Sequence, residues 1–235
     1  IEKKERFIEL LQEKRQALVT QAVTKGLDPS VPMKDSGIEW IGEVPTHWEI
    51  KKLSYLTRCR DGSRIPLNAI ERDSRKGSIP YWGASKIIDY VNESIFDEEV
   101  ILIGEDGAPF FDRGKPVAFY SNGPIWPNNH VHILKAKDSP DTQFLVHVLN
   151  TTDYTFSVDG ATRDKLTQAG MMQIPIQYPP ESEKKEILKF IGTETTRIDQ
   201  LIDKTRRSID LLKERRSSLI TAAVTGKIDV RGEAA

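Results

Sequence analysis

Hydrophobic residues recur at helical spacing near the C-terminal end of the 235-residue chain. Residues 187–225 contain no proline, and Lys, Arg, Glu and Asp flank their apolar positions. The apolar stripe consists of Ile191, Ile198, Leu201, Ile202, Ile209, Leu212 and Leu219. An apolar repeat of about seven residues between charged flanks is typical of a long helix that packs against a partner helix.

The same helical sequence occurs near the N-terminus. LLQEKRQALVTQAVT at residues 10–24 returns as LLKERRSSLITAAVT at residues 211–225, and the match runs without a gap from Ile1 against Ile202 to Asp28 against Asp229. Two unrelated amphipathic surface helices are the alternative, but they need not share residues. We therefore predict two long antiparallel, coiled-coil-like helices. Their pairing residues are Ile8, Leu11, Leu18, Ile191, Ile198, Ile202, Ile209, Leu212 and Leu219.

Between the two helices the pattern changes to short strands. Residues 27–50 are rich in Pro, Gly and Asp, and four β-like runs follow: YVNESIF, EEVILIG, PVAFY and HVHILKA. DTQFLVHVLNTT has a helical pattern, ATRDKLTQAG is a short helix or a turn, and QIPIQYPP runs extended into the last helix. Without a regular alternation of strand and helix, the pattern predicts a mixed α/β (α+β) domain.

Composition limits the kinds of site and the cellular compartment that we expect for this protein. The net charge is −1, so any site for a polyanion must come from local patterning. One cysteine, Cys59, excludes an internal disulfide framework and a cysteine-rich zinc site, and fits a reducing compartment. No apolar run reaches the roughly 20 residues of a membrane span, and no signal-peptide pattern is present. We expect a cytoplasmic protein with no membrane partner.

Charge is unevenly distributed in the middle of the chain. Residues 48–86 hold nine basic and four acidic residues, 9 − 4 = +5, whereas residues 87–112 hold eight acidic residues and no basic one, −8. A polyanion would be attracted to the first segment and repelled by the second, unless both runs are simply solvated faces. The basic segment also carries Tyr81 and Trp82, for which anchoring in the core is favoured over contact with a base.

Side chains able to bind phosphates or base edges define the candidate DNA-binding set. It comprises Arg58, Arg60, Ser63, Arg64, Arg75, Lys76, Ser85, Lys86, Asn128, Asn129, His130, Arg163 and Lys165.

The sequence offers no catalytic constellation. His130 and His132 alternate on one predicted strand, but no third metal ligand stands at a useful spacing, so a structural or DNA-facing role is favoured over a metal site. IGEDGAP lacks the glycine spacings of phosphate and dinucleotide loops, GxSxG is absent, and Cys59 has no evident partner histidine. YPPE at 178–181 lacks the residue order of a DNA amino-methylating enzyme. We expect no active site and no metal site.

Three segments resemble the specificity subunit of type I restriction–modification systems. DSGIEWIGEVPTHWEIKKL (35–53) resembles the beginning of that family's target recognition domain, and EEVILIGEDGAP (98–109) resembles its central strand and turn. DGATRDKLTQAGMMQIPIQYPPESEKKEILKFI (159–191) resembles the exit into a helical region, with Ser182 and Lys184 as minor departures. The helical repeat matches the two helical regions that alternate with two recognition domains in this family.

The resemblance implies that the chain is the later half of such a subunit. Residues 1–26 would end the central helical region, 27–186 would form a target recognition domain, 187–226 the C-terminal helical region and 227–235 a tail. Because the pattern starts in mid-helix at Ile1, we expect a longer natural protein with a further domain upstream.

The resemblance also implies a role. The chain would be a non-catalytic subunit that reads one part of a bipartite DNA target, with helices that set the spacing and dock modification subunits. S-adenosylmethionine, ATP and magnesium would belong to the modification and endonuclease subunits, and none to this chain. A lone half could also pair with itself as a homodimer. The alternatives are a fragment of a DNA methyltransferase and a non-catalytic helical scaffold.

Overall fold

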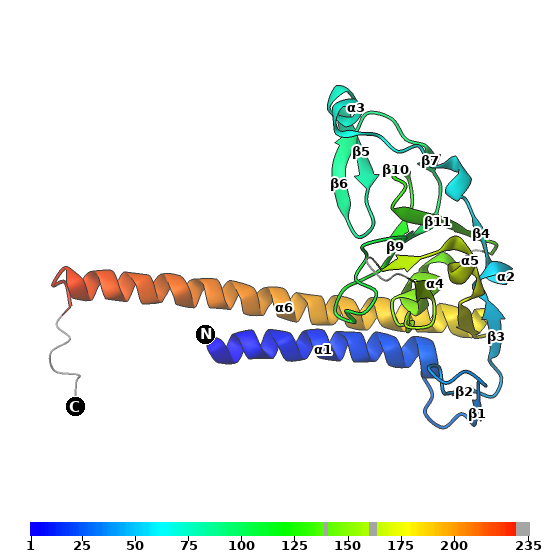
Figure 1. Ribbon diagram of the computed structural model, residues 1–235. Helices are drawn as coiled ribbons and strands as arrows, with labels where there is room; N and C mark the ends of the chain where they lie inside the picture. Colours follow the sequence, from blue (N-terminus) through cyan, green and yellow to red (C-terminus); the bar gives the residue numbers. More distant parts are fainter. Residues whose placement is uncertain (139–140, 160–163, 229–235) are drawn as a thin grey trace. The chain divides into compact units, whose positions relative to one another are not determined.

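The computed structural model describes residues 1–138, 141–159 and 164–228 (Figure 1). The chain divides into two compact units, one formed by residues 1–18 and 190–235 and the other by Val19–Lys189. The first unit is helical, and the second mixes small sheets with short helices. The expected mixed α/β class with two long helices is therefore confirmed. Arg163 of the candidate set lies outside the described residues.

Two long helices dominate the secondary structure: α1 (Glu2–Lys25) and α6 (Glu181–Val224). Gly26 directly follows α1 and has φ +78°, the left-handed conformation that commonly ends a helix. Helix α6 begins at Glu181, earlier than the predicted start at residue 187. The acidic residues Glu181 and Glu183 occupy its first turn, where carboxylates interact favourably with the helix dipole.

In the helical unit the two end segments pack against each other (Figure 1). Leu11 forms a buried cluster with Ile198 and Ile202, and Ile8 and Leu18 pack against it. The ion pairs Arg15–Asp199 (3.1 Å) and Glu5–Lys213 (3.7 Å) show that the two segments run antiparallel. The predicted helix pairing is confirmed.

Two predicted pairing residues depart from this pattern. Ile191 and Ile209 are buried as expected, but Leu212 is 36% exposed and Leu219 is 50% exposed. In the antiparallel register Glu5 lies opposite Lys213, so the later part of α6 extends past the described residues of α1. Leu212 and Leu219 are the most exposed of the predicted pairing residues.

The unit Val19–Lys189 is built from short elements. Its remaining helices are α2 (Leu53–Leu56), α3 (Ala69–Ser74), α4 (Asp141–Leu149), α5 (Gln168–Gln173) and the 3₁₀ turn η1 (Asp61–Ser63). Its strands are β1 (Met33–Asp35), β2 (Glu43–Pro45), β3 (Glu49–Lys52), β4 (Thr57–Cys59), β5 (Lys76–Trp82), β6 (Ile87–Val91), β7 (Phe96–Asp97), β8 (Val100–Gly104), β9 (Ala118–Ser121), β10 (Pro124–Pro127), β11 (Val131–Ala136), β12 (Val158–Asp159), β13 (Lys165–Leu166) and β14 (Pro175–Tyr178).

Two four-stranded sheets form the centre of this unit. Their orders are β4-β11-β8-β9, which is antiparallel throughout, and β6-β5-β10-β7, in which β10 runs parallel to β5. Strands β1–β2, β3–β14 and β12–β13 form separate two-stranded pairs. The β5–β6 hairpin (Lys76–Val91) was not predicted, because its apolar residues do not alternate cleanly and its register shifts twice.

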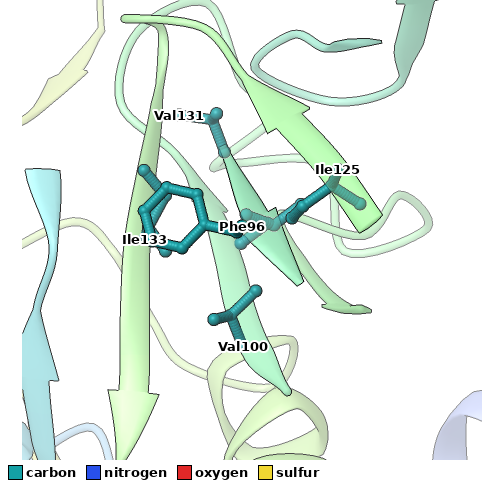
Figure 2. Close-up of a cluster of buried hydrophobic side chains, with 6 residues drawn as sticks. Phe96, Val100, Ile125, Val131 and Ile133 are labelled. Carbon is teal, nitrogen blue, oxygen red and sulfur yellow. The ribbon is translucent and has the colours of Figure 1, made fainter. Parts of the chain in front are cut away.

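The core lies where these two sheets meet. Figure 2 shows Phe96, Val100, Ile125, Val131 and Ile133, which come from strands of both sheets and are all at least 96% buried. All five residues of β8 are buried, which explains the continuous apolar run VILIG. Helix α4 packs on the sheet β4-β11-β8-β9, which confirms the helix predicted there.

The aromatic pair of the basic segment also belongs to the core. Tyr81 is 1% exposed and packs with Leu67, Val91 and Trp126, and Trp82 packs against Phe119 with ring centroids 5.3 Å apart. The preference for core anchoring over base contact is confirmed for Tyr81. Within the described ranges, no helix combines the length and apolar character that crossing a bilayer requires.

Candidate nucleic-acid interface

Four turns that are distant in sequence meet at one edge of the unit Val19–Lys189. We call residues 83–86, 104–107, 128–130 and 164–165 the turn cluster. Backbone hydrogen bonds join three of them in series: Glu105 N–H donates to the carbonyl of His130 (2.9 Å), and Gly107 N–H donates to the carbonyl of Asp164 (3.3 Å).

The hairpin turn 83–86 joins the same cluster. Asn128 N–H donates to the carbonyl of Trp82 (2.9 Å). A Cβ on Gly104 would stand 2.8 Å from the carbonyl oxygen of Ala84 and 2.3 Å from the Cβ of Ala108. Only glycine allows the β8 backbone to approach the hairpin turn this closely.

The turn cluster brings together six candidate DNA-binding residues from three separate segments: Ser85, Lys86, Asn128, Asn129, His130 and Lys165. Lys86 and Asn129 are exposed, and the side chains of His130 and Lys165 are 42% and 51% exposed. Asn128 is 6% exposed, and its side-chain oxygen accepts a hydrogen bond from His130 N–H (2.8 Å). Asn128 thus shapes the turn, while its neighbours face solvent.

Arg64 lies beneath this surface, with its side chain 17% exposed. Its guanidinium donates to the carboxylate of Glu105 (2.5 Å) and to the carbonyls of Asn129 (3.3 Å) and Val131 (3.2 Å). It also donates to the carbonyl of Asp61 (3.1 Å). Arg64 is one of the predicted DNA-binding residues, but its donors hold the turn that carries His130. Ser63 stands exposed beside it.

A buried charged group supports the same turns. His132, with a 2% exposed side chain, donates through Nε2 to the carbonyl of Leu166 (2.8 Å), and its Nδ1 lies 2.5 Å from Oδ2 of Asp61. Burial opposes ionisation of Asp61, but the hydrogen bond from His132 and the amide of Ile133 hold its pKa below the usual value.

The pKa of Glu105 is set by the same two opposing effects, burial and hydrogen bonding. Its burial alone would raise the pKa, but hydrogen bonds from Arg64 and Lys165 lower it overall. Ligand atoms of Asp61, Glu105 and His132 lie within 4.8 Å of one another, a spacing compatible with a metal ion. Arg64 and Lys165 already pair with the same carboxylates, so side chains of the protein balance the charge of this group.

The charge segregation seen in the sequence does not persist in space. The basic segment folds against the acidic one through ion pairs Arg60–Glu98 (3.2 Å), Arg72–Asp89 (3.2 Å), Arg75–Glu93 (3.1 Å) and Lys76–Asp89 (3.1 Å). The expectation of an attracting and a separate repelling region is therefore wrong. Arg58 and Lys86 are exposed and form no ion pair with any residue in the described part of the chain.

The remaining candidates lie elsewhere in this unit. Arg75 precedes strand β5 and Lys76 is its first residue, whereas Ser85 follows the strand, and a seven-residue strand spans roughly 20 Å. Arg58 is on β4, and Arg60 pairs with Glu98 before β8. Sequence reasoning missed Glu105 and Asp106 as supports of the turn cluster. Their position directly after a buried strand, in IGEDGAP, was the available signal.

A second polar feature of the same unit has a structural explanation. A cavity of about 310 Å³ is lined by residues that include Asp138, Asp141, Tyr178 and Lys184. Lys184 and Asp141 form a buried ion pair, and the Tyr178 hydroxyl donates to Asp141 (2.6 Å) and accepts from Lys184 (2.6 Å). Burial and Asp141 raise the pKa of Tyr178. Lys184 thus links helix α4 to the start of α6.

Comparisons with known proteins identify the family. The profile of the type I restriction modification DNA specificity domain matches residues 45–210. A type I restriction enzyme specificity subunit of Haemophilus influenzae is 33% identical over 163 residues, which is 69% of this chain and 39% of that protein. The MjaX specificity subunit of Methanocaldococcus jannaschii is 22% identical over 233 residues, 95% of this chain and 53% of that protein.

Solved structures share the fold. The S subunit of a type I restriction–modification system from M. genitalium superposes with a TM-score of 0.56 at 15% identity, covering 93% of this chain and 55% of that one. The HsdS subunit from Thermoanaerobacter tengcongensis gives 0.52 at 13% identity, covering 96% and 53%. The chain thus spans roughly half, or less, of the length of the relatives it matches. A family profile that covers most of this chain places it in the type I restriction–modification DNA specificity family.

Proposed function

We propose that this chain forms one DNA-reading half of a type I specificity subunit and binds one part of a bipartite target in double-stranded DNA. The observation that carries this proposal is the turn cluster, which gathers Lys86, Asn129, His130 and Lys165 at one edge of a domain of the DNA specificity family. The two lysine side chains can bind phosphates, and the amide of Asn129 and the imidazole of His130 can form hydrogen bonds with base edges.

The proposal makes the chain a non-catalytic component that acts in the cytoplasm. S-adenosylmethionine would be held by the modification subunits, and ATP and magnesium by the endonuclease subunit. The helical unit would provide the docking surface for the modification subunits. Binding of S-adenosylmethionine by this chain alone would instead favour the methyltransferase fragment.

A self-paired form is part of the proposal. Leu212, Leu219 and Ile220 on α6 are 36%, 50% and 57% exposed. They belong to the repeat copy whose counterpart in α1 packs through Leu11. A second copy of the chain could cover this apolar stripe, which would give two identical domains and a palindromic split target. A monomer at micromolar concentration in sedimentation would contradict this pairing.

The test begins with the DNA target, which methylation mapping of cells carrying the complete system reports directly. The chain, assembled with its modification subunits, is then titrated with that duplex and with a scrambled duplex over a series of salt concentrations. We expect tighter binding to the target at moderate salt. Equal affinity for both duplexes would support the scaffold alternative, because phosphate contacts alone carry no sequence information.

Variants of the turn cluster refine this test. Lys86→Ala and Lys165→Ala should weaken binding to both duplexes and reduce the salt dependence by about one released ion each. The matched control is Lys213→Ala, which removes an exposed lysine from the helical unit. If Lys86→Ala and Lys165→Ala behave like this control, the turn cluster is not the DNA-binding surface.

A further inference from the structure

In the turn cluster, hydrogen bonds fix the backbone of His130 and of the residues on either side of it. Its N–H donates to the side chain of Asn128 (2.8 Å), and its carbonyl accepts from Glu105 N–H (2.9 Å). The carbonyls of the residues before and after it, Asn129 and Val131, both accept from Arg64. The imidazole therefore projects from a turn that is rigid before any partner binds, which reduces the entropy lost on binding.

The orientation of the ring is fixed as well. Nδ1 of His130 lies 2.7 Å from Oδ1 of Asp106, and a carboxylate oxygen only accepts hydrogen bonds. Nδ1 must therefore carry the hydrogen. In the neutral ring this leaves Nε2 with a lone pair, and the side chain is 42% exposed to solvent.

From this geometry we infer that His130 is a specificity-determining residue whose Nε2 accepts a hydrogen bond from the exocyclic amino group of adenine or cytosine. These amino groups are the hydrogen-bond donors that bases present in the major groove, whereas guanine and thymine present acceptors there. Asp106 acts as a positioning residue, because it selects the tautomer. The inference rests on the proposed function and adds which base chemistry the site reads.

The surroundings of His130 fit this role. Exposed Lys86, which forms no ion pair in the described part of the chain, provides positive charge for a flanking phosphate, and half-exposed Lys165 can contact a second phosphate while it pairs with Glu105 (3.1 Å). The nearby carboxylates of Glu105 and Asp106 face Arg64, Lys165 and the His130 ring.

The experiment uses the mapped target duplex and the complex with modification subunits. Each adenine or cytosine of the recognised half is replaced in turn by an analogue that lacks the exocyclic amino group. At one position the analogue should weaken binding by the wild type about five- to tenfold, the effect of one lost hydrogen bond. The same analogue should leave the affinity of His130→Ala unchanged, because the accepting atom is already absent.

Asp106→Asn tests the positioning role. An amide can donate as well as accept, so the ring can take either tautomer, and guanine or thymine should become tolerated at the same position. The control is His47→Ala, because His47 is also 42% exposed and lies 2.7 Å from a carboxylate, Glu183, but has no place in the turn cluster. This control should keep the wild-type base preference.

The outcomes separate the two levels of the proposal. A wild-type complex that binds target and scrambled DNA equally contradicts the proposed function itself. Specific binding whose base preference is the same in His130→Ala contradicts only the role of His130. A wild-type requirement for guanine or thymine at the position that depends on His130 would show that Nε2 donates, and would overturn the assignment of an acceptor.

Discussion

At the residue scale, hydrogen-bond partners separate groups that the sequence treats alike. Arg64 and Lys86 are both basic residues of one segment, yet Arg64 is 17% exposed with its donors on internal acceptors, whereas Lys86 is exposed without an ion pair in the described chain. His130 and His132 differ in the same way, since the first faces solvent and the second is buried. The type of a residue indicates what it is able to bind, and its partners decide whether it is available.

The buried carboxylates predict how stability depends on pH. The pKa values of Asp61 and Glu105 are lowered in the folded state, so their stabilisation is fully present above the usual carboxyl pKa of about 4 and is lost as the pH falls through the folded values. The melting temperature should hold from neutral pH to about pH 5 and fall below about pH 4. Thermal unfolding followed by circular dichroism over this range measures it.

Asp61→Asn should flatten this acid-induced fall and lower stability at neutral pH by about 3 kcal/mol, because it leaves His132 buried without its charged partner. Asp73→Asn, at an exposed carboxylate, is the control and should follow the wild-type curve. A curve for Asp61→Asn that superposes on the wild type would show that this buried pair does not contribute to acid sensitivity.

At the element scale, the helix repeat describes an apolar stripe longer than the pairing that is formed. Leu11 and Leu212 occupy equivalent positions in the two copies, but Leu11 is 7% exposed and Leu212 is 36% exposed. Helical periodicity shows which face of a helix seeks a partner. How far along that face a partner extends depends on the register of the antiparallel pair.

Substitution of two leucines tests this difference. Leu11→Ala should destabilise the helix pair by about 2–3 kcal/mol, because it removes buried methyl groups from the cluster with Ile198 and Ile202. Leu219→Ala, at a half-exposed position of the same stripe, should change stability by less than about 0.5 kcal/mol in the monomer. Urea unfolding measures both, and equal effects would contradict the observed register.

At the scale of the whole molecule, the proposed function gives the two long helices a role in setting the spacing of a bipartite target. If the helices set the distance between two reading domains, one added helical turn changes it by about 5.4 Å, somewhat more than the rise of one base pair. Inserting about four residues within the α6 segment Phe190–Val224 should therefore change the required spacer and leave the recognised bases unaltered.

Methylation mapping in cells that carry the altered subunit in the complete complex measures the spacer length and the recognised bases together. An unchanged spacer would refute the role of the helices as a ruler. A change in the recognised bases would show that the insertion has disturbed the reading domain, whose turn cluster lies in the unit Val19–Lys189.

The sequence by itself determined the long helices, their antiparallel pairing and the mixed character of the domain between them. The helices and the mixed domain follow from local periodicity, and the pairing follows from a repeat between residues 1–28 and 202–229, both of which can be read directly along the chain. Tertiary structure alone decided the pairing of the basic segment with the acidic one and the gathering of residues 83–86, 104–107, 128–130 and 164–165. Ion pairs and turn contacts join residues far apart in the chain, and no local pattern encodes which distant partner each side chain meets.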